Sequence, residues 1–268
     1  MYTVAHKRPL PLKRPQRFTE KINWRIVHDR RDILRPLGDK MAMKKYAASR
    51  ASGVLIPETL WSGSKLSGFL DTHPAGPWVV KPNHRSGLVI FGSDSTPTDP
   101  HVVVSDEWLQ ERNGRYKGEW AYQFAKRCLI AEANISPGGD IPMDYKFYVF
   151  RGRIPLIHVD ADRFDGISRT FFTPEWRQIS ATNGFPASHG ISAPDNLPEM
   201  LEAASKLGAE FDFIRVDLYS DGKQIWFGEF TPYPAGGLRH YAPDSFDTWL
   251  GSFWELPHFN NRNRRIGL

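Results

Sequence analysis

The chain has 268 residues and a mass of 30.6 kDa, which is enough to bury a sizeable core in one large domain or in two lobes. Its one cysteine, Cys128, excludes an intramolecular disulfide framework and a cysteine-based zinc site, and it is typical of a reducing compartment. No apolar run approaches the length of a membrane span, and the first residues lack the apolar segment of a signal peptide. We therefore predict a cytoplasmic protein.

The formal net charge is +5, and the isoelectric point lies near 9.3. Basic residues concentrate at the two ends of the chain, at 6–17 and 260–268. Such ends are commonly solvated tails, or contacts to anionic lipid or polyanionic polysaccharide. Because no zinc-finger or RNA-recognition signature accompanies them, we predict no specific nucleic-acid binding. An anionic membrane surface or a polyanion stays open as a partner of the ends.

Two helices are predicted after a proline-rich basic segment at 1–17, which we expect to be extended. Thr19 is the predicted N-cap of a helix that runs to about Arg30. Asp39 begins a second helix, DKMAMKKYAASR, with Lys40 in its first turn. The helix dipole disfavours a cation at this position, so an anionic ligand at the helix start would remove the conflict. The alternative is an ordinary solvated lysine.

A strand is predicted at 55–61, and a strand–loop–strand follows at 78–91. Lys81 ends the apolar run of the first of these two strands. The loop after it carries groups that can wrap phosphate oxygens, namely Asn83, His84, Ser86 and Gly87. This order differs from a P-loop, in which GxxxxGK[ST] opens a helix. The alternative is a polar hairpin tip from which Lys81 extends into solvent.

The rest of the chain reads as hairpin strands with a few helices. We expect helices at 105–113, at 120–126, from Pro198 and at 245–254. Strands are expected at 128–132, 144–150 and 154–160. About 40 residues interrupted by Pro, Gly and Ser follow the last of these strands. Strands in hairpin order with helices against them predict an α+β fold with antiparallel sheets.

A last hairpin is predicted from strands at 213–219 and 224–230, joined by Ser-Asp-Gly-Lys. Arg215, Asp217 and Glu229 interrupt its apolar pattern. Lone charges in buried strands are unfavourable unless they are paired or bound to a metal. An Arg215–Asp217 salt bridge with a purely structural role is one interpretation of these charges.

The register of this hairpin decides what its carboxylates can do. An odd-numbered loop places Asp217, Phe227, Glu229 and Thr231 on one face, whereas an even-numbered loop separates Asp217 from Glu229. With a five-residue loop, Asp217 lies opposite Phe227 and diagonal to Glu229, close enough for both carboxylates to reach one or two Mg²⁺ ions. Arg215 on the same face could meet a phosphate, and Thr231 adds an oxygen ligand or a donor.

Eight segments in order resemble the TupA-like branch of the ATP-grasp proteins, across residues 18–257: FTEKINW, GDKMAMKKY, VVKPNHRSG, LIAEANI, DYKFYVFRG, HVDADRF, FIRVDLY and FGEFTP. The resemblance implies two α+β lobes with antiparallel sheets that clamp ATP, and a shortened N-terminal lobe. It divides the chain into a basic arm with a helix (1–38), an N-lobe with the phosphate loop (39–137), a C-lobe with the metal site (138–257) and a basic tail (258–268).

The resemblance also implies a nucleotide site. Lys40 and Lys81 would contact the ATP phosphates. The other contacts that it carries over are His84, Ser86 and Gly87 in the loop over the phosphates, Glu132 at the adenine amino group, the backbone of Ala133, Asn134 and Ile135 at the ring edge, Asp144 at the ribose, and Lys146 with Asp162 and Arg163 along the nucleotide or acceptor site.

The same resemblance implies the catalytic groups. Arg215 would stabilise the transferring phosphoryl group, together with Lys81 and Arg163. Asp217 and Glu229 would hold Mg²⁺, and Thr231 stands where ATP-grasp enzymes usually have asparagine, which leaves the number of metal ions open.

The implied function is that of an ATP-dependent carboxylate–amine ligase, which forms an amide through an acylphosphate. Its substrates would be a carboxylate and an amine, small molecules or polysaccharides, in the biosynthesis of cell-surface polysaccharide or a related metabolite. A kinase that phosphorylates a sugar hydroxyl is one alternative, and a non-catalytic protein that binds nucleotide or polyanion is another.

Overall fold

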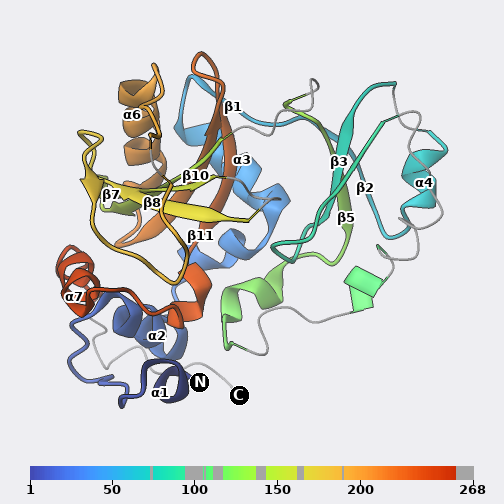
Figure 1. Cartoon of the computed structure of the whole chain (residues 1–268). Coiled ribbons are helices and arrows are strands. Elements are labelled where there is room, and N and C mark those ends of the chain that lie inside the picture. Colours follow the sequence, from blue (N-terminus) through green and yellow to red (C-terminus); the bar gives the residue numbers. More distant parts are fainter. Residues whose placement is uncertain are drawn as a thin grey trace.

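The computed structural model describes residues 1–72, 75–93, 105, 107–110, 117–136, 143–161, 166–188 and 190–257, which form two sheets with helices around them (Figure 1). The larger sheet has seven strands in the order β1-β11-β10-β6-β7-β8-β9, and the smaller has four in the order β2-β5-β3-β4. Among the described residues, every pairing between these strands is antiparallel except β1 with β11, which is parallel. The predicted α+β class with mainly antiparallel sheets is confirmed.

The strands are β1 (Val54–Leu55), β2 (Thr59–Gly63), β3 (Trp78–Pro82), β4 (Ile90–Gly92), β5 (Leu129–Ala133), β6 (Met143–Phe150), β7 (Arg153–Ala161), β8 (Ser168–Phe172), β9 (Gln178–Ile179), β10 (Ile214–Ser220) and β11 (Ile225–Thr231). The α-helices are α1 (Tyr2–His6), α2 (Phe18–His28), α3 (Lys40–Arg50), α4 (Ser67–Leu70), α6 (Leu197–Gly208) and α7 (Asp244–Ser252), and the 3₁₀ helices are η1 (Asp32–Gly38), η2 (Trp120–Phe124) and η3 (Pro234–Gly237). In the described residues, no helix is both long and apolar enough to cross a membrane.

The starts of two helices test the capping predictions. Asp39 caps α3 as expected, because its Oδ1 accepts from the backbone N–H of Ala42 at 3.0 Å. The prediction for Thr19 is wrong: the N-cap of α2 is Arg17, two residues earlier, and the Thr19 hydroxyl donates instead to Asp247 at 2.6 Å. The Glu20 side chain instead provides a hydrogen-bond acceptor for the backbone just before the helix, because its Oε2 accepts from the N–H of Arg17 at 3.0 Å.

Three further expectations differ from the structure. The predicted strand 55–61 is divided between the two sheets, because Pro57 has no N–H for a ladder and falls between β1 and β2. The segment after β7 contains two strands, β8 and β9, that its Pro, Gly and Ser content concealed. The N-terminal segment begins with α1 and is therefore not fully extended. Of the helix predicted at 105–113, only residues 105 and 107–110 lie within the described part, and they are helical.

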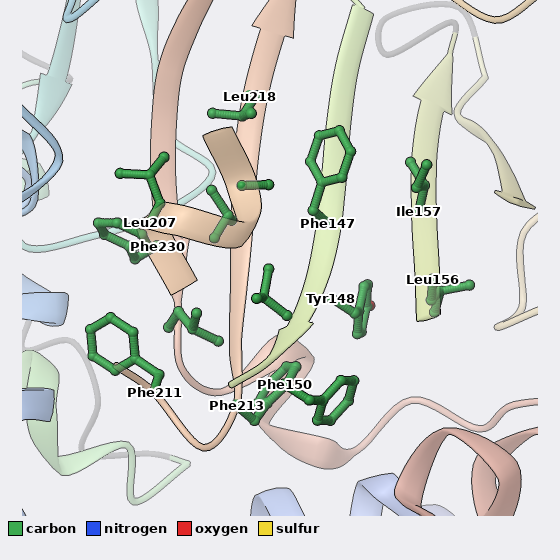
Figure 2. Packing of buried hydrophobic residues seen from close by; sticks show 14 of the residues in the cluster. Phe147, Tyr148, Phe150, Leu156, Ile157, Leu207, Phe211, Phe213, Leu218 and Phe230 are labelled. Carbon is green, nitrogen blue, oxygen red and sulfur yellow. The ribbon is translucent and has the colours of Figure 1, made fainter. Parts of the chain in front are cut away.

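One face of the larger sheet is apolar and is covered by α6 and α3. Val216 and Leu218 of β10 and Phe147 of β6 are fully buried there, and Figure 2 shows Leu207 of α6 beside Phe230 in this packing. Met43 and Ala47 of α3 belong to the same core. The smaller sheet has a core of its own with α4, built on residues such as Phe69, Trp78 and Val80. Helix α3 and β1 thus pack with the larger sheet, and the smaller sheet takes its strands from residues 59–133.

The other face of the larger sheet is strongly polar. Its cross-strand pairs place Asp217 of β10 between Glu229 of β11 and Lys146 of β6, and Lys146 next to His158 of β7. A second row runs alongside the first, through Tyr219, Asp144, Asp160 and Arg169. Each row therefore places two carboxylates side by side, with a cation, Lys146 or Arg169, next to them. Opposite charges beside a buried carboxylate make its burial tolerable.

Candidate functional site

A cavity of about 580 Å³ lies between the two sheets. Eleven of the predicted site residues line it, from both sheets and from α3: Lys40, Lys81, Ser86, Gly87, Glu132, Ala133, Asn134, Ile135, Asp144, Asp217 and Glu229. Apolar groups cover part of its wall, including Val79 and the half-exposed Phe91, which pair across β3 and β4. The cavity therefore combines lysines, carboxylates and an apolar surface, which is the composition of a site for a charged ligand with a flat apolar part.

The two carboxylates meet through a β-bulge. Ser220 pairs with Ile225, so the turn has four residues, and the ladder runs regularly to Leu218 opposite Phe227. At that point the register shifts, and Asp217 lies directly opposite Glu229, with Gly228 as the extra residue. A side chain at Gly228 would bring a Cβ to 2.9 Å from the carbonyl oxygen of Asp217, so the bulge needs glycine.

This geometry differs from both cases that we considered for the loop. Asp217 is not opposite Phe227, and the loop does not have five residues. Phe227 and Glu229 both border the cavity, but the ring of Phe227 is buried and packs on Phe230 in the apolar core, with 4.8 Å between the ring centroids. The Glu229 side chain is 28% exposed and lies on the side of Asp217. A bulge reverses the alternation of side chains along a strand, and that reversal lets an even-numbered turn still place both carboxylates on one face.

Arg215 holds Asp217 in a bidentate ion pair. Its Nε and Nη2 donate to the two carboxylate oxygens at 2.7 and 2.6 Å, and Nη2 also donates to the hydroxyl of Thr231 at 2.9 Å. Burial raises the pKa of Asp217 to about 6, although the charges of Arg215 and Lys146 act against the rise. Glu229 is paired less tightly than Asp217. Its Oε1 lies 3.5 Å from Arg215 Nη2, its one salt bridge within the described residues, and 28% of its side chain is exposed.

Lysines from α3 and β3 gather around a third carboxylate, Glu132. Lys81 of β3 pairs with Glu132 of β5 at 2.6 Å, and Lys44 of α3 pairs with the same carboxylate at 3.0 Å. Burial alone would raise the pKa of Glu132, but the two lysines hold it below its ordinary value. Lys40 donates to the carbonyl oxygen of Arg85. Burial lowers the pKa of Lys40 to about 8, with Glu229 opposing the change and Lys81 adding to it.

The start of α3 is not an open anion site. The backbone N–H groups of Lys40, Met41 and Ala42 already donate to the Asn83 carbonyl, the Asn83 side-chain oxygen and Asp39, respectively. The expectation that an anion at the helix start would relieve Lys40 is therefore wrong as far as the helix N–H groups are concerned. Only the lysine side chain reaches the cavity.

Beneath the cavity floor lies a buried ion network. Lys146 contacts Asp144 and also pairs with Asp160 at 3.0 Å, while Arg169 donates to Asp160 at 2.6 Å. His158 is hydrogen-bonded to Asp160 at 2.8 Å, yet burial lowers the pKa of His158 to about 3, so the imidazole is neutral at pH 7. Burial opposes the ionisation of Asp160, but the His158 hydrogen bond and the neighbouring cations outweigh it and lower the pKa of Asp160.

The chain matches one family model, TupA-like ATPgrasp, over residues 20–255. It belongs to the TupA-like ATP-grasp family. The predicted resemblance is thereby confirmed, and with it the ATP-grasp fold. A search of curated proteins finds no match to this family member.

Several solved structures are similar to this TupA-like protein. D-alanine–D-alanine ligase from Bacillus anthracis, complexed with ATP, is 17% identical over 73% of this chain and 56% of that chain, with a TM-score of 0.43. D-alanine–D-alanine ligase from Helicobacter pylori is 13% identical over 84% of this chain and 60% of that chain, with a TM-score of 0.46. The ATP-grasp ligase PsnB, complexed with a phosphomimetic variant of its minimal precursor, Mg and ADP, is 9% identical over 75% and 52%, with a TM-score of 0.41. The TupA-like chain thus spans between 52% and 60% of the length of these proteins.

The remaining predicted site residues of this TupA-like protein lie near the cavity but not on its wall. Lys146, Arg215 and Thr231 support Asp144, Asp217 and Glu229 from behind, and His84 is buried at the base of the loop. Arg163, like Asp162, lies outside the described residues.

Sequence reasoning missed Lys44 and the apolar wall. Lys44 follows Lys40 by one helical turn, and this spacing was the available signal. Val79 alternates with Lys81 along β3, so the two share the cavity face while Trp78 and Val80 face the smaller core.

The donor set of the TupA-like site suits Mg²⁺. Asp217 and Glu229 offer hard carboxylate oxygens as direct cross-strand neighbours, and Mg²⁺ is usually bound by one or two carboxylates together with substrate phosphates. In the part of the chain that the structure describes, no group of three or more His, Cys, Asp or Glu residues could hold a metal by itself. The ion would therefore depend on oxygens that the nucleotide brings.

Proposed function

We propose that this protein is an ATP-dependent ligase that joins a carboxylate to an amine. The observation that supports this function best is the meeting of Lys40 and Lys81 with Asp217 and Glu229 around one cavity. Lysines suit the phosphates of ATP, and the carboxylates suit the Mg²⁺ that accompanies them. Phosphoryl transfer relies on positioning and charge neutralisation, and this set of side chains supplies both.

In this proposal the nucleotide lies across the cavity wall. Lys40, Lys81 and the loop residues Ser86 and Gly87 bind the phosphates, and Glu132 with the backbone of Ala133–Ile135 binds the adenine edge. Lys81 then exchanges its contact with Glu132 for a phosphate contact, while Lys44 keeps the carboxylate paired. Asp144 faces the ribose. Asp217 and Glu229 would hold Mg²⁺, which when bound neutralises phosphate charge.

The proposed reaction has two steps. A carboxylate oxygen of the first substrate attacks the γ-phosphorus, the bond to the β-phosphate oxygen breaks, and ADP leaves. The amine nitrogen then attacks the acyl carbon, the bond to the phosphate oxygen breaks, and phosphate leaves as the amine releases a proton. Arg215, which Asp217 and Thr231 hold behind the cavity wall, stabilises the transferring phosphoryl group through its charge in this proposal. We further propose a cytoplasmic role in cell-surface polysaccharide or related biosynthesis.

Nucleotide binding is the first test of this function. With AMPPNP and Mg²⁺ at a hundredfold excess over Kd, the free energy of unfolding should rise by about 2.7 kcal/mol. Asp217→Asn should lose the Mg²⁺-dependent part of this gain, whereas Asp71→Asn, a change of an exposed aspartate, should keep it. Thermal unfolding with and without Mg²⁺ measures both. A folded wild type without any stabilisation would refute the proposal.

Products then separate ligation from its alternative. Carboxylates and amines are screened for ADP release, and the product is analysed for phosphate. Release of free phosphate together with a new amide supports the ligase. A product that carries the phosphate on a sugar hydroxyl would instead show that the protein is a kinase.

The lowered pKa of Lys40 predicts a pH dependence of nucleotide affinity. Because this pKa is about 8, the ammonium is charged below pH 8 and is lost above it, unless a bound phosphate retains the proton. The affinity for AMPPNP·Mg²⁺ should therefore fall from pH 8 to pH 10, by at most about tenfold per pH unit. Calorimetric titrations across this range measure it. Lys40→Arg keeps its charge throughout and should flatten the profile; an equally steep fall in that variant would assign the effect to another group.

A further inference from the structure

The buried side chain of Asn83 and the partly buried side chain of Asp39 join the base of the phosphate loop to α3. The Asn83 side-chain oxygen accepts from the N–H of Met41 at 3.0 Å, and its Nδ2 donates to Asp39 Oδ2 at 2.8 Å. Asp39 Oδ1 meanwhile accepts from the N–H of Ala42 at 3.0 Å. The first turn of α3 is thus capped partly by its own residue and partly by a loop from the other sheet. We call these two side chains the Asp39–Asn83 latch.

The latch also holds the segment that leads into β5. Asn83 Nδ2 donates to the carbonyl of Lys126 at 2.9 Å, and the N–H of Lys126 donates to Asp39 Oδ2 at 2.9 Å. The backbone N–H of Asn83 donates to the carbonyl of Cys128 at 2.9 Å. Asn83 has no exposed surface, and every hydrogen-bonding group of its side chain is used. Such a saturated buried amide fixes one geometry, because any shift leaves polar groups without partners.

The position of the latch relates it to the site. Asn83 follows Lys81 by two residues on the β3 side, and Asp39 directly precedes Lys40 on the α3 side. Helix α3 is anchored in the larger core through Met43 and Ala47, the core that also carries β10 and β11. Neither Asp39 nor Asn83 lines the cavity. The latch therefore connects the two lysines to the sheet of Asp217 and Glu229 without touching the ligand space itself.

We propose that Asp39 and Asn83 are positioning residues, which hold Lys40 and Lys81 at the distance from Asp217 and Glu229 that phosphoryl transfer requires. The inference rests on the proposed function. A displacement of about 1 Å from a change remote from the chemistry can lower a rate by about 10²-fold. Asn83→Ala should accordingly lower the kcat for ATP turnover by about 10²-fold, with a change of less than about tenfold in KM for ATP, because Asn83 makes no contact with the cavity.

Hydrogen exchange tests the latch without nucleotide. In the wild type, the amides of Lys40, Met41 and Ala42 should be protected. In Asn83→Ala, the exchange of Met41 should become at least about tenfold faster, while Ala42 keeps its acceptor on Asp39. Unchanged exchange at Met41 would overturn the latch as a structural feature.

Asp39→Ser separates positioning from helix capping. Serine caps helices as well as aspartate does, so Ala42 stays bonded, but the shorter side chain cannot reach Asn83 and Lys126. This variant should show the same loss of kcat as Asn83→Ala, and it also serves if Asn83→Ala fails to fold. Asp32→Ser, at the exposed start of η1, is the matched control and should retain full kcat.

The outcomes distinguish this inference from the proposed function. Wild-type kcat in folded Asn83→Ala or Asp39→Ser would overturn the positioning role alone. A wild type that neither releases ADP from ATP nor binds AMPPNP·Mg²⁺ would overturn the proposed function, and the inference with it.

Discussion

Glu229→Gln is expected to lower ATP turnover by about 10²–10³-fold without disturbing the fold. Glu229 lies on the cavity wall opposite Asp217. Its carboxylate is the more available of the two for a metal, because Arg215 donates hydrogen bonds to both oxygens of Asp217. Glutamine has the same shape but no charge, so the site should bind Mg²⁺ poorly while the bulge stays intact. ADP release at saturating ATP and Mg²⁺ measures the effect.

The control for this variant is Glu202→Gln, on the exposed face of α6, where the carboxylate contacts only Lys206 in the described structure. It should retain the wild-type rate. If Glu229→Gln turned over ATP within about threefold of the wild type, with an unchanged unfolding midpoint, Glu229 would have no part in the charge neutralisation on which the mechanism depends.

Arg25→Ala is expected to have a large effect on stability, a loss of about 3–5 kcal/mol in the free energy of unfolding. Arg25 is fully buried, pairs with Asp212 at 2.8 Å and lies over the ring of Trp254, 4.3 Å from its centroid. Its guanidinium also donates to the carbonyl of Phe213 at 2.9 Å, at the start of β10. Truncation leaves a buried carboxylate with less compensation and a carbonyl without its donor. Urea denaturation measures the loss.

Arg31→Ala is the matched comparison, because Arg31 pairs with the same Asp212 at 2.7 Å but 30% of its side chain is exposed. Water can replace part of its contribution, so its loss of stability should be clearly smaller. Equal losses in the two variants would show that burial does not set the contribution of Arg25.

The sequence contained much of the site but not its geometry. Lys40, Lys81, Glu132, Asp217 and Glu229 could be placed on elements by alternation and capping, and the structure brings all five to one cavity. What each one binds stays a prediction, as does the division of the chain into lobes.

The hairpin shows why geometry was harder to predict. Alternation with a period of two puts Phe227 and Glu229 on the same face, and only the bulge separates them. A glycine within a strand often marks a bulge, and Gly228 is such a glycine. However, a glycine alone does not determine which register the two strands adopt.

Contacts between distant segments were beyond prediction. The Lys44–Glu132 pair and the Asp39–Asn83 latch each join residues more than forty positions apart, and neither leaves a periodic pattern in the chain. Pro57 marks where the predicted strand 55–61 is interrupted, but the distant partners of its two halves, β11 for β1 and β5 for β2, leave no such signal.

That split also bears on the order in which the chain can fold as it is synthesised. The strands of the smaller sheet all lie within residues 59–133, so they are available to pair once this stretch has emerged. The larger sheet can be completed only after residues near the other end of the chain have emerged, because Val54 pairs with Ile225 and α2 packs on α7 (Figure 1). Pairings this distant in sequence form slowly, since long loops must close first. A growing chain therefore has Lys81 and the loop after β3 before it has Asp217 and Glu229, the carboxylates on the other side of the cavity.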